Sequence, residues 1–350
     1  MTRIIAFVGL LALATPLCAA PLKLDEEVLL VPTVARDAGD GRIIVPVDAW
    51  VHEHEPRRGA MALFARYLAL DLDELPAEER ARFTARTQLF RVDSERGKVL
   101  RVGFADGREA TLPRTRGDGR SRAEVEIDAA LVDARGRIEY EVLMPPGDAR
   151  RLAGRVLHVP AEGLSIVSDI DDTIKHSQVR DRRELLLNTF LRRFIAAPGM
   201  AARYRELAAT PSTRFHYVSA SPLQLLPALD TFLAEAGFPV GSLHLRETTS
   251  LTRLWRSDSR AHKHAAIESL LRDFPRRRFV LVGDSGEADP EIYADLARAH
   301  AQQIAAIAIR DVSGEGADAE RYRTTFAGLD RDLWQVFTTA DEWRIEAAAD

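Results

Sequence analysis

The feature that most constrains the fold is an apolar run, Leu164 to Ser168, that ends in a cluster of aspartates. A short β-branched run between polar residues is typical of a strand buried in a parallel sheet. Ligands bind at the carboxyl edge of such sheets, so Asp169 and Asp171 are expected to project there. Crowded carboxylates repel one another unless a cation compensates them, and Mg²⁺ prefers oxygen ligands. Taken alone, an Asp-rich turn or helix cap would explain the same residues.

Three later segments have polar residues in a matching arrangement. A second strand pattern, Phe215 to Val218, runs into Ser219 to Pro222. Lys263 stands at the start of a helical pattern. A third strand pattern, Phe279 to Val282, leads into an acidic loop, Gly283 to Asp289. Together with the first aspartates, these segments predict one site at the edge of an α/β sheet.

This ordered set resembles the four motifs of the haloacid dehalogenase superfamily of phosphotransferases. More narrowly, Asp169 to Thr173, Tyr217 to Pro222 and Gly283 to Glu291 are similar to the catalytic domain of actin-patch-type phosphatidate phosphatases. Leu185 to Leu191 and Pro198 to Met200 resemble that family too, and the resemblance covers roughly residues 163–312. It implies a Rossmann-like parallel sheet with helices on both faces.

The resemblance also implies a role for each site residue. Asp169 would be the nucleophile, Asp171 the general acid and base, and Lys263 the cation that neutralises the transferring group. Asp172 is assigned no chemistry and is expected to cap the turn after the strand. The phosphoryl group would lie against Thr173, Ser219, Ala220 and Lys263, and Mg²⁺ would be held by Asp169, Asp171 (through its carbonyl), Asp284 and Asp289.

The function implied is Mg²⁺-dependent hydrolysis of phosphatidate to diacylglycerol and phosphate through an aspartyl phosphate. The alternative is the same chemistry on another phosphomonoester, such as a lysolipid, a sugar phosphate or a phosphoprotein. A non-enzymatic reading, a binding module joined to a degenerate phosphatase domain, is disfavoured because Asp169, Asp171, Ser219, Lys263 and Asp284 are all present.

Between Thr173 and Pro198 lies an insertion, residues 174–198, that is too long for a simple strand-to-helix turn. It combines several arginines with Leu186, Leu187 and Phe190. Two readings remain open for these apolar side chains. They contact a membrane beside a lipid substrate, or they pack on the sheet.

The segment before residue 158 has mostly period-two patterns, as at Glu124 to Asp128 and Ile138 to Val142. These predict half-buried antiparallel strands, and Pro46 in the run Ile43 to Val51 favours an edge strand. Helical patterns at Ala60 to Ala69 and Ala77 to Arg86 predict a helical insertion. His52 and His54 could share a strand face and bind a metal, although exposed polar residues explain them equally well.

The N-terminus resembles a secretory signal peptide, with Arg3, an apolar run from Ile4 to Ala14, and small residues up to Ala20. It predicts export to the periplasm, and a lipid anchor at Cys18 is disfavoured because bulky Leu17 precedes it. The expected divisions are therefore a signal peptide (1–20), a β-rich domain (21–157) and an α/β catalytic domain (158–350). The net charge of −5 over 350 residues gives no indication of nucleic-acid binding, and the sequence does not define an oligomeric state.

Overall fold

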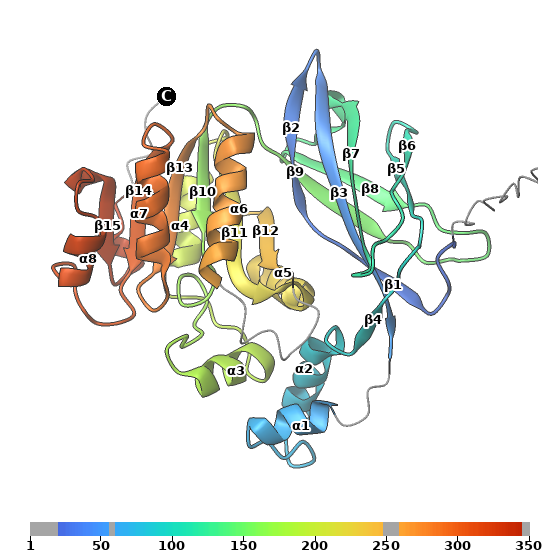
Figure 1. Cartoon of the computed structure of the whole chain (residues 1–350), viewed down its shortest axis with the longest axis horizontal. Helices are drawn as coiled ribbons and strands as arrows, with labels where there is room; N and C mark the ends of the chain where they lie inside the picture. The colour runs from blue at the N-terminus through green and yellow to red at the C-terminus, as the bar shows by residue number, and fades with distance from the viewer. Residues whose placement is uncertain (1–19, 56–59, 248–258, 345–350) are drawn as a thin grey trace, which may run out of the picture.

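The computed structural model describes residues 20–55, 60–247 and 259–344. A β-rich region formed by the first half of the chain lies beside an α/β region formed by the second half (Figure 1). β9 ends at His158 and β10 begins at Leu164. The division of the chain at residue 157 stays a prediction, and the predicted signal peptide lies almost entirely outside the described residues.

Nine strands form the sheet of the β-rich region, in the order β1-β3-β2-β9-β8-β5-β6, with β4 and β7 also paired to β3. Apolar side chains that alternate along β3 and β7, such as Val45, Val47 and Ile127, are fully buried, as the period-two pattern predicts. The strands are β1 (Glu26–Leu30), β2 (Thr33–Gly39), β3 (Arg42–His54), β4 (Val92–Ser94), β5 (Arg101–Phe104), β6 (Glu109–Thr111), β7 (Arg120–Asp128), β8 (Arg137–Val142) and β9 (Ala153–His158).

The prediction that Pro46 marks an edge strand is wrong, because β3 pairs with β1, β2, β4 and β7. At Pro46 itself, however, only β7 lies opposite, with Glu124 as the partner. On the other side of β3, β2 pairs with residues 42–44 and β1 with residues 49–53. Pro46 therefore lies between the segments of β3 that pair with β2 and with β1. Because no described strand pairs with β3 on that side at Pro46, the missing N–H of proline costs no hydrogen bond of the sheet.

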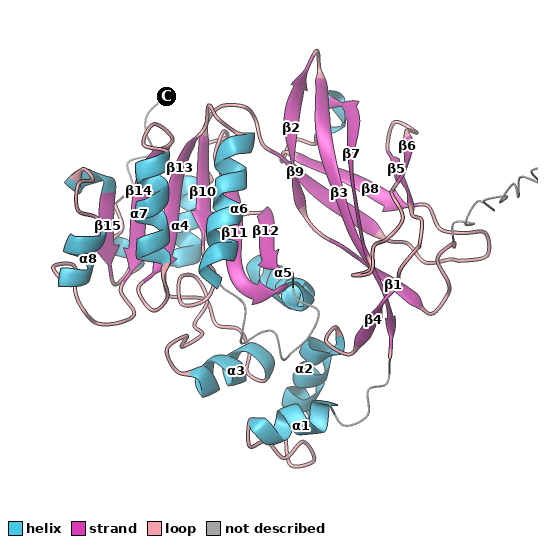
Figure 2. Cartoon of the chain, viewed as in Figure 1, coloured by secondary structure: helices cyan, strands magenta, loops and turns pink. Residues whose placement is uncertain are grey.

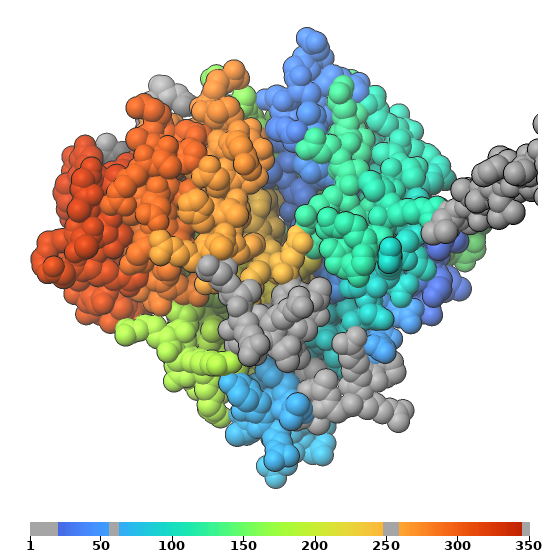
Figure 3. Space-filling view, viewed as in Figure 1, coloured from blue at the N-terminus to red at the C-terminus, as the bar shows by residue number. Residues whose placement is uncertain are grey.

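The predicted helical insertion is confirmed between β3 and β4. Its two helices are α1 (Ala60–Tyr67) and α2 (Ala77–Gln88). They lie away from the β-rich sheet, and α2 contacts α3 (Arg182–Phe190) of the α/β region (Figure 2). The space-filling view shows the surface of α1 and α2 next to that of α3 (Figure 3). The insertion thus bridges the two halves of the chain.

The second sheet has six parallel strands in the order β12-β11-β10-β13-β14-β15, which confirms the predicted α/β fold. Successive residues of β10 face opposite sides: Ile166 packs in one apolar cluster and Val167 in another. The strands are β10 (Leu164–Ser168), β11 (Arg214–Pro222), β12 (Gly241–Arg246), β13 (Arg278–Asp284), β14 (Ile304–Arg310) and β15 (Trp334–Phe337).

Helices cover both faces of this sheet. α4 (Met200–Leu207) and α5 (Leu226–Glu235) contribute to the cluster around Ile166, whereas α6 (Ser259–Asp273) and α7 (Asp289–Ala299) contribute to the cluster around Val167. A short helix, α8 (Glu320–Thr325), packs near α7. Within the described residues, the helices are all too short or too polar to cross a bilayer.

Candidate active site

Three aspartates meet at the carboxyl edge of the six-stranded sheet. Asp169 follows β10, Asp284 ends β13, and Asp289 begins α7. β10 and β13 are adjacent and parallel, so their ends lie side by side. All three carboxylates are buried, and each offers an oxygen within 4.8 Å of the others. The structure therefore brings together three of the residues that the sequence placed in one site.

Lys263 of α6 reaches into this cluster. Its Nζ lies 2.8 Å from Asp169 Oδ1, 2.6 Å from Asp289 Oδ1 and 2.8 Å from Glu287 Oε2. Although burial by itself would lower the pKa of Lys263, the surrounding carboxylates hold it well above its usual value. Lys263 is therefore a permanent cation beside Asp169. It stands in the second turn of α6, because the helix begins at Ser259.

The remaining contacts of the cluster fit a further cation. One oxygen of Asp284 accepts a hydrogen bond from the N–H of Gly286 at 2.6 Å, while the other is buried and has no hydrogen-bond partner among the described residues. Burial raises the pKa of Asp284 well above its usual value, and the carboxylates of Asp289 and Asp169 add to the shift. Burial likewise raises the pKa of Asp169, although Lys263 opposes the effect. A hard divalent cation would compensate this crowding, and oxygen-only ligands suit Mg²⁺.

Gly283 is required by the close approach of Asp289. A Cβ at position 283 would lie 2.5 Å from Asp289 Oδ2. That oxygen accepts a hydrogen bond from the N–H of Asp284 at 3.2 Å. Both oxygens of Asp289 thus have protein partners, so Asp289 orients Lys263 and the backbone of Asp284.

Asp171 lies outside this cluster and has a separate set of hydrogen-bonding and ion-pair partners. Its Oδ1 is 2.8 Å from Lys175 Nζ and accepts from Ser177 Oγ at 2.7 Å. Its Oδ2 accepts from Ser219 Oγ at 3.2 Å and from Ser221 Oγ at 2.9 Å. Burial would raise the pKa of Asp171, but Lys175 and the hydroxyl donors outweigh it and lower the pKa to about 2.

The turn after β10 is fixed by Asp172. Its φ of 57° is in the left-handed region, which an aspartate tolerates better than most residues. Its carboxylate accepts hydrogen bonds from the backbone N–H groups of Ser177, Gln178 and Val179 at 2.7–2.8 Å. The expected capping role is therefore seen in the structure. Thr173 donates its hydroxyl to Asp169 Oδ2 at 2.9 Å.

A cavity of about 400 Å³ opens beside Asp171. Ala220 and Ser221 lie on its wall, and Ser219 accepts from the N–H of Ser221 at 2.9 Å. Half of its fourteen lining residues are apolar, Arg182 and Arg246 are basic, and Asp171 and Glu287 are acidic. The apolar lining includes Val179, Leu185, Leu186, Phe190, Pro222 and Leu225.

The buried side chains of the 174–198 insertion contradict the membrane-facing reading. Leu186, Leu187 and Phe190 are 3%, 3% and 2% exposed, because α3 packs them toward the sheet and the helical insertion. Leu186 and Phe190 nevertheless line the cavity.

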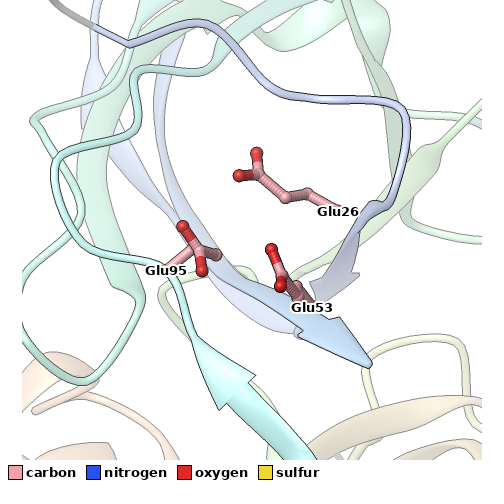
Figure 4. Close-up of side chains that lie close together, drawn as sticks. All are labelled: Glu26, Glu53 and Glu95. Carbon is pink, nitrogen blue, oxygen red and sulfur yellow. The ribbon is translucent and has the colours of Figure 1, made fainter. Parts of the chain in front are cut away.

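A second acidic group lies in the β-rich region, where Glu26, Glu53 and Glu95 come together (Figure 4). Lys98 contacts Glu26 and lies 3.7 Å from Glu95, and Lys23 lies 3.4 Å from Glu26 and 3.8 Å from Glu53. Two lysines therefore already compensate most of the charge of these three carboxylates. The idea of a metal at His52 and His54 gains no support, since neither belongs to a group of three or more metal-ligating side chains within the described residues.

Sequence reasoning did not foresee several residues of the site. The contacts of Lys175 and Ser177 with Asp171 were not predicted. These residues lie in a non-helical turn, where sequence spacing does not indicate which side chains meet. The edge strand β12, which places Arg246 at the cavity, was missed because the polar residues of Gly241–Arg246 weaken its strand pattern.

The sheet is parallel, an Asp-x-Asp turn follows one strand, and a further aspartate, Asp284, ends the neighbouring strand. With the buried Lys263 beside these carboxylates, this arrangement defines a haloacid dehalogenase-like domain. Residues 164–311 match the family described as phosphatidate phosphatase APP1, catalytic domain.

Two curated proteins are similar to part of the chain. Phosphatidate phosphatase APP1 of Saccharomyces cerevisiae is 36% identical over 165 residues, which cover 46% of this chain and 28% of the yeast protein. An uncharacterized protein of Schizosaccharomyces pombe is 30% identical over 199 residues, which cover 54% of this chain and 32% of that protein. The chain thus spans about a third or less of the length of these relatives.

Proposed function

We propose that the chain is a Mg²⁺-dependent phosphatase that hydrolyses phosphatidate to diacylglycerol and phosphate. The observation that supports this most directly is the position of Asp169, which lies 2.8 Å from Lys263 and beside Asp284 in a segment that matches the phosphatidate phosphatase family. Asp169 and Asp284 would hold Mg²⁺, which supplies positive charge to the phosphoryl oxygens when bound.

In the first half-reaction, a carboxylate oxygen of Asp169 attacks phosphorus and the bond to the ester oxygen breaks. Asp171 donates a proton to that leaving oxygen, so the alcohol departs neutral. In the second half-reaction, Asp171 takes a proton from water, whose oxygen attacks the phosphorus and releases phosphate and Asp169. Lys263 stabilises the negative charge that develops on the phosphoryl group in both steps.

The structure as described fits the second half-reaction, because Lys175 keeps Asp171 charged and ready to accept a proton. The first half-reaction needs protonated Asp171. A substrate phosphate beside Asp171 favours that form, since a nearby negative charge raises the pKa of a carboxyl group.

The cavity next to Asp171 supports a substrate with an apolar group attached to its phosphate. Its leucines and Phe190 suit acyl chains, and Arg182 and Arg246 suit the polar head. The alternative substrate is another phosphomonoester, such as a lysolipid, a sugar phosphate or a phosphoprotein.

A phosphate-release assay on the purified chain tests the proposal, with phosphatidate in micelles, a lysolipid phosphate, a sugar phosphate and a phosphopeptide, each with and without Mg²⁺. We expect release from phosphatidate that EDTA abolishes. Asp169→Asn should lower the rate by at least about 10³-fold while the protein stays folded. Preference for a soluble substrate would favour the alternative, and activity retained by Asp169→Asn would refute the nucleophile assignment.

We also propose export to the periplasm and contact with a lipid surface. The first rests on the basic start and apolar run of residues 1–20, and the second on the proposed substrate. N-terminal sequencing of protein from a periplasmic fraction and co-sedimentation with phosphatidate vesicles test them.

A further inference from the structure

Helix α3 forms one wall of the cavity beside Asp171, through Arg182, Leu185, Leu186, Thr189 and Phe190. The helix has nine residues, and a helix this short is marginal without neighbours that hold it. The side chain of Asp181 caps its first turn by accepting the N–H groups of Arg183 and Glu184. What holds its other end comes from a distant part of the chain.

Two arginines of α2 bind the carbonyl groups at the end of α3. Arg86 Nη1 lies 2.9 Å from the carbonyl oxygen of Thr189 and 2.7 Å from that of Arg192. Arg82 Nη1 donates to the carbonyl of Leu191 at 2.7 Å. The last carbonyls of a helix have no partner within the helix, and the negative end of its dipole favours a cation. Arg82 and Arg86 therefore supply the missing cap from more than a hundred residues away.

An aromatic cluster joins the same elements. The ring of Phe190 lies edge-on to Phe64 of α1 at 5.1 Å and to Phe90, just after α2, at 5.7 Å. Phe83 of α2 stacks on Phe64 at 5.9 Å. Since Phe190 also lines the cavity, this cluster connects the helical insertion directly to the cavity wall.

Two series of contacts run from Arg86 to Asp171. In the first, Arg86 Nη1 lies 3.5 Å from the carbonyl oxygen of Asn188, the Asn188 side chain donates to the carbonyl of Ser177 at 3.0 Å, and Ser177 Oγ donates to Asp171. In the second, the guanidinium of Arg86 lies 3.5 Å from the centre of the Phe194 ring, and Lys175 Nζ lies 4.8 Å from the same ring. Lys175 then pairs with Asp171.

We propose that α2, an element of the β-rich half of the chain, is a positioning part of the active site, with Arg86 as its main positioning residue. By holding the carboxyl end of α3 and the ring of Phe194, Arg86 fixes the cavity wall and the surroundings of Asp171. The kinetic consequences rest on the phosphatase function proposed above, whereas the structural consequence for α3 does not.

The test compares Arg86→Ala with Arg80→Ala in the full chain. Arg80 is on the same helix but donates to the carbonyls of Asp73 and Leu75 in its own segment, so it is a matched control. Hydrogen exchange of the α3 amides should become roughly tenfold faster in Arg86→Ala, because hydrogen bonds to a charged group are lost. Arg80→Ala should leave that exchange unchanged.

The kinetic arm measures kcat and KM on long-chain phosphatidate and on p-nitrophenyl phosphate, which is too small to need the α3 wall. Arg86→Ala should raise KM for phosphatidate about tenfold and change KM for the small substrate less than about twofold. Arg86→Lys, which keeps the charge but has one donor group in place of the planar fork, should recover part of the loss.

Each outcome decides the proposal. If Arg86→Ala exchanges α3 amides at the parental rate, the positioning role is refuted, and an equal change of KM on both substrates also counts against it. If the parent releases no phosphate from any substrate, the proposed function fails, and the exchange experiment alone decides the role of Arg86. If Arg86→Ala does not fold, Arg86→Lys replaces it with a smaller expected effect.

Discussion

Lys175 and Asp171 form a buried ion pair, with Nζ 2.8 Å from Oδ1. Lys175 is 1% exposed, and its ammonium also donates to Ser177 Oγ at 2.5 Å. The pair lies beside the cavity, where Asp171 is the proposed acid and base. It therefore links the stability of the insertion to the chemistry of the site.

Removing the cation of this pair should destabilise the protein. We expect Lys175→Met to lower the free energy of unfolding at pH 7 by roughly 3–5 kcal/mol, because it leaves Asp171 charged, buried and uncompensated. Urea denaturation measures the effect. The double variant Asp171→Asn, Lys175→Met is the control and should lose less than the single variant, since no charge remains unpaired. A double variant at least as unstable as Lys175→Met would contradict this account.

Asp284 should determine the response to Mg²⁺. We expect Asp284→Asn to raise the Mg²⁺ concentration for half-maximal activity about tenfold or more, since one anchoring carboxylate is lost. A Mg²⁺ titration of phosphate release gives the value. Glu53→Gln is the matched control, because Glu53 belongs to the separate acidic group of the β-rich region, where Lys23 lies 3.8 Å from it. An unchanged titration for Asp284→Asn would remove Asp284 from the cation site.

Phe190 should behave as a core residue. We expect Phe190→Ala to lower the free energy of unfolding by roughly 3–5 kcal/mol, because it leaves a cavity among Phe64, Phe90 and α3. Activity on phosphatidate should fall as well, because Phe190 lines the cavity. Ile195→Ala is the control in the same insertion, since Ile195 is 60% exposed. Normal stability with activity lost on vesicles alone would restore the membrane-facing reading.

His216 should make the protein less stable in mild acid. Its ring is fully buried between Ser242 Oγ at 2.8 Å and Ser165 Oγ at 3.2 Å, and burial lowers its pKa well below the usual value. Below about pH 6.5 the unfolded chain binds a proton at this position that the folded chain does not. The free energy of unfolding should therefore fall by up to about 1.4 kcal/mol per pH unit from this residue.

Urea denaturation at pH 7.5 and 5.5 measures this contribution by difference. His216→Asn should be less stable than the parent at pH 7.5, and its stability should fall by about 1 kcal/mol less between the two pH values. The exposed His176 serves as a control, and His176→Asn should follow the parent. Parallel pH curves for the parent and His216→Asn would show that the pKa of His216 is the same in the folded and unfolded chain, which would contradict this account.

The sequence predicted the parts of the structure that depend on local pattern. β10, β13 and the aspartates after them were predictable because a buried parallel strand is a continuous apolar run, and because parallel strands end at one edge. α3 was not predicted, since its leucines follow one another in sequence and do not repeat with a helical period. The capping of α3 by Arg82 and Arg86 depends on contacts between segments more than a hundred residues apart, which no local pattern describes.

The left-handed turn at Asp172 has a consequence for substrate binding. Three backbone N–H groups donate to its carboxylate, so contacts within the protein set the path of the chain from Asp169 to Val179. Conformational entropy lost at that stage is not lost again when a phosphate ester arrives. Binding energy from the ester is then available to align the phosphorus with Asp169 instead of ordering the loop around it.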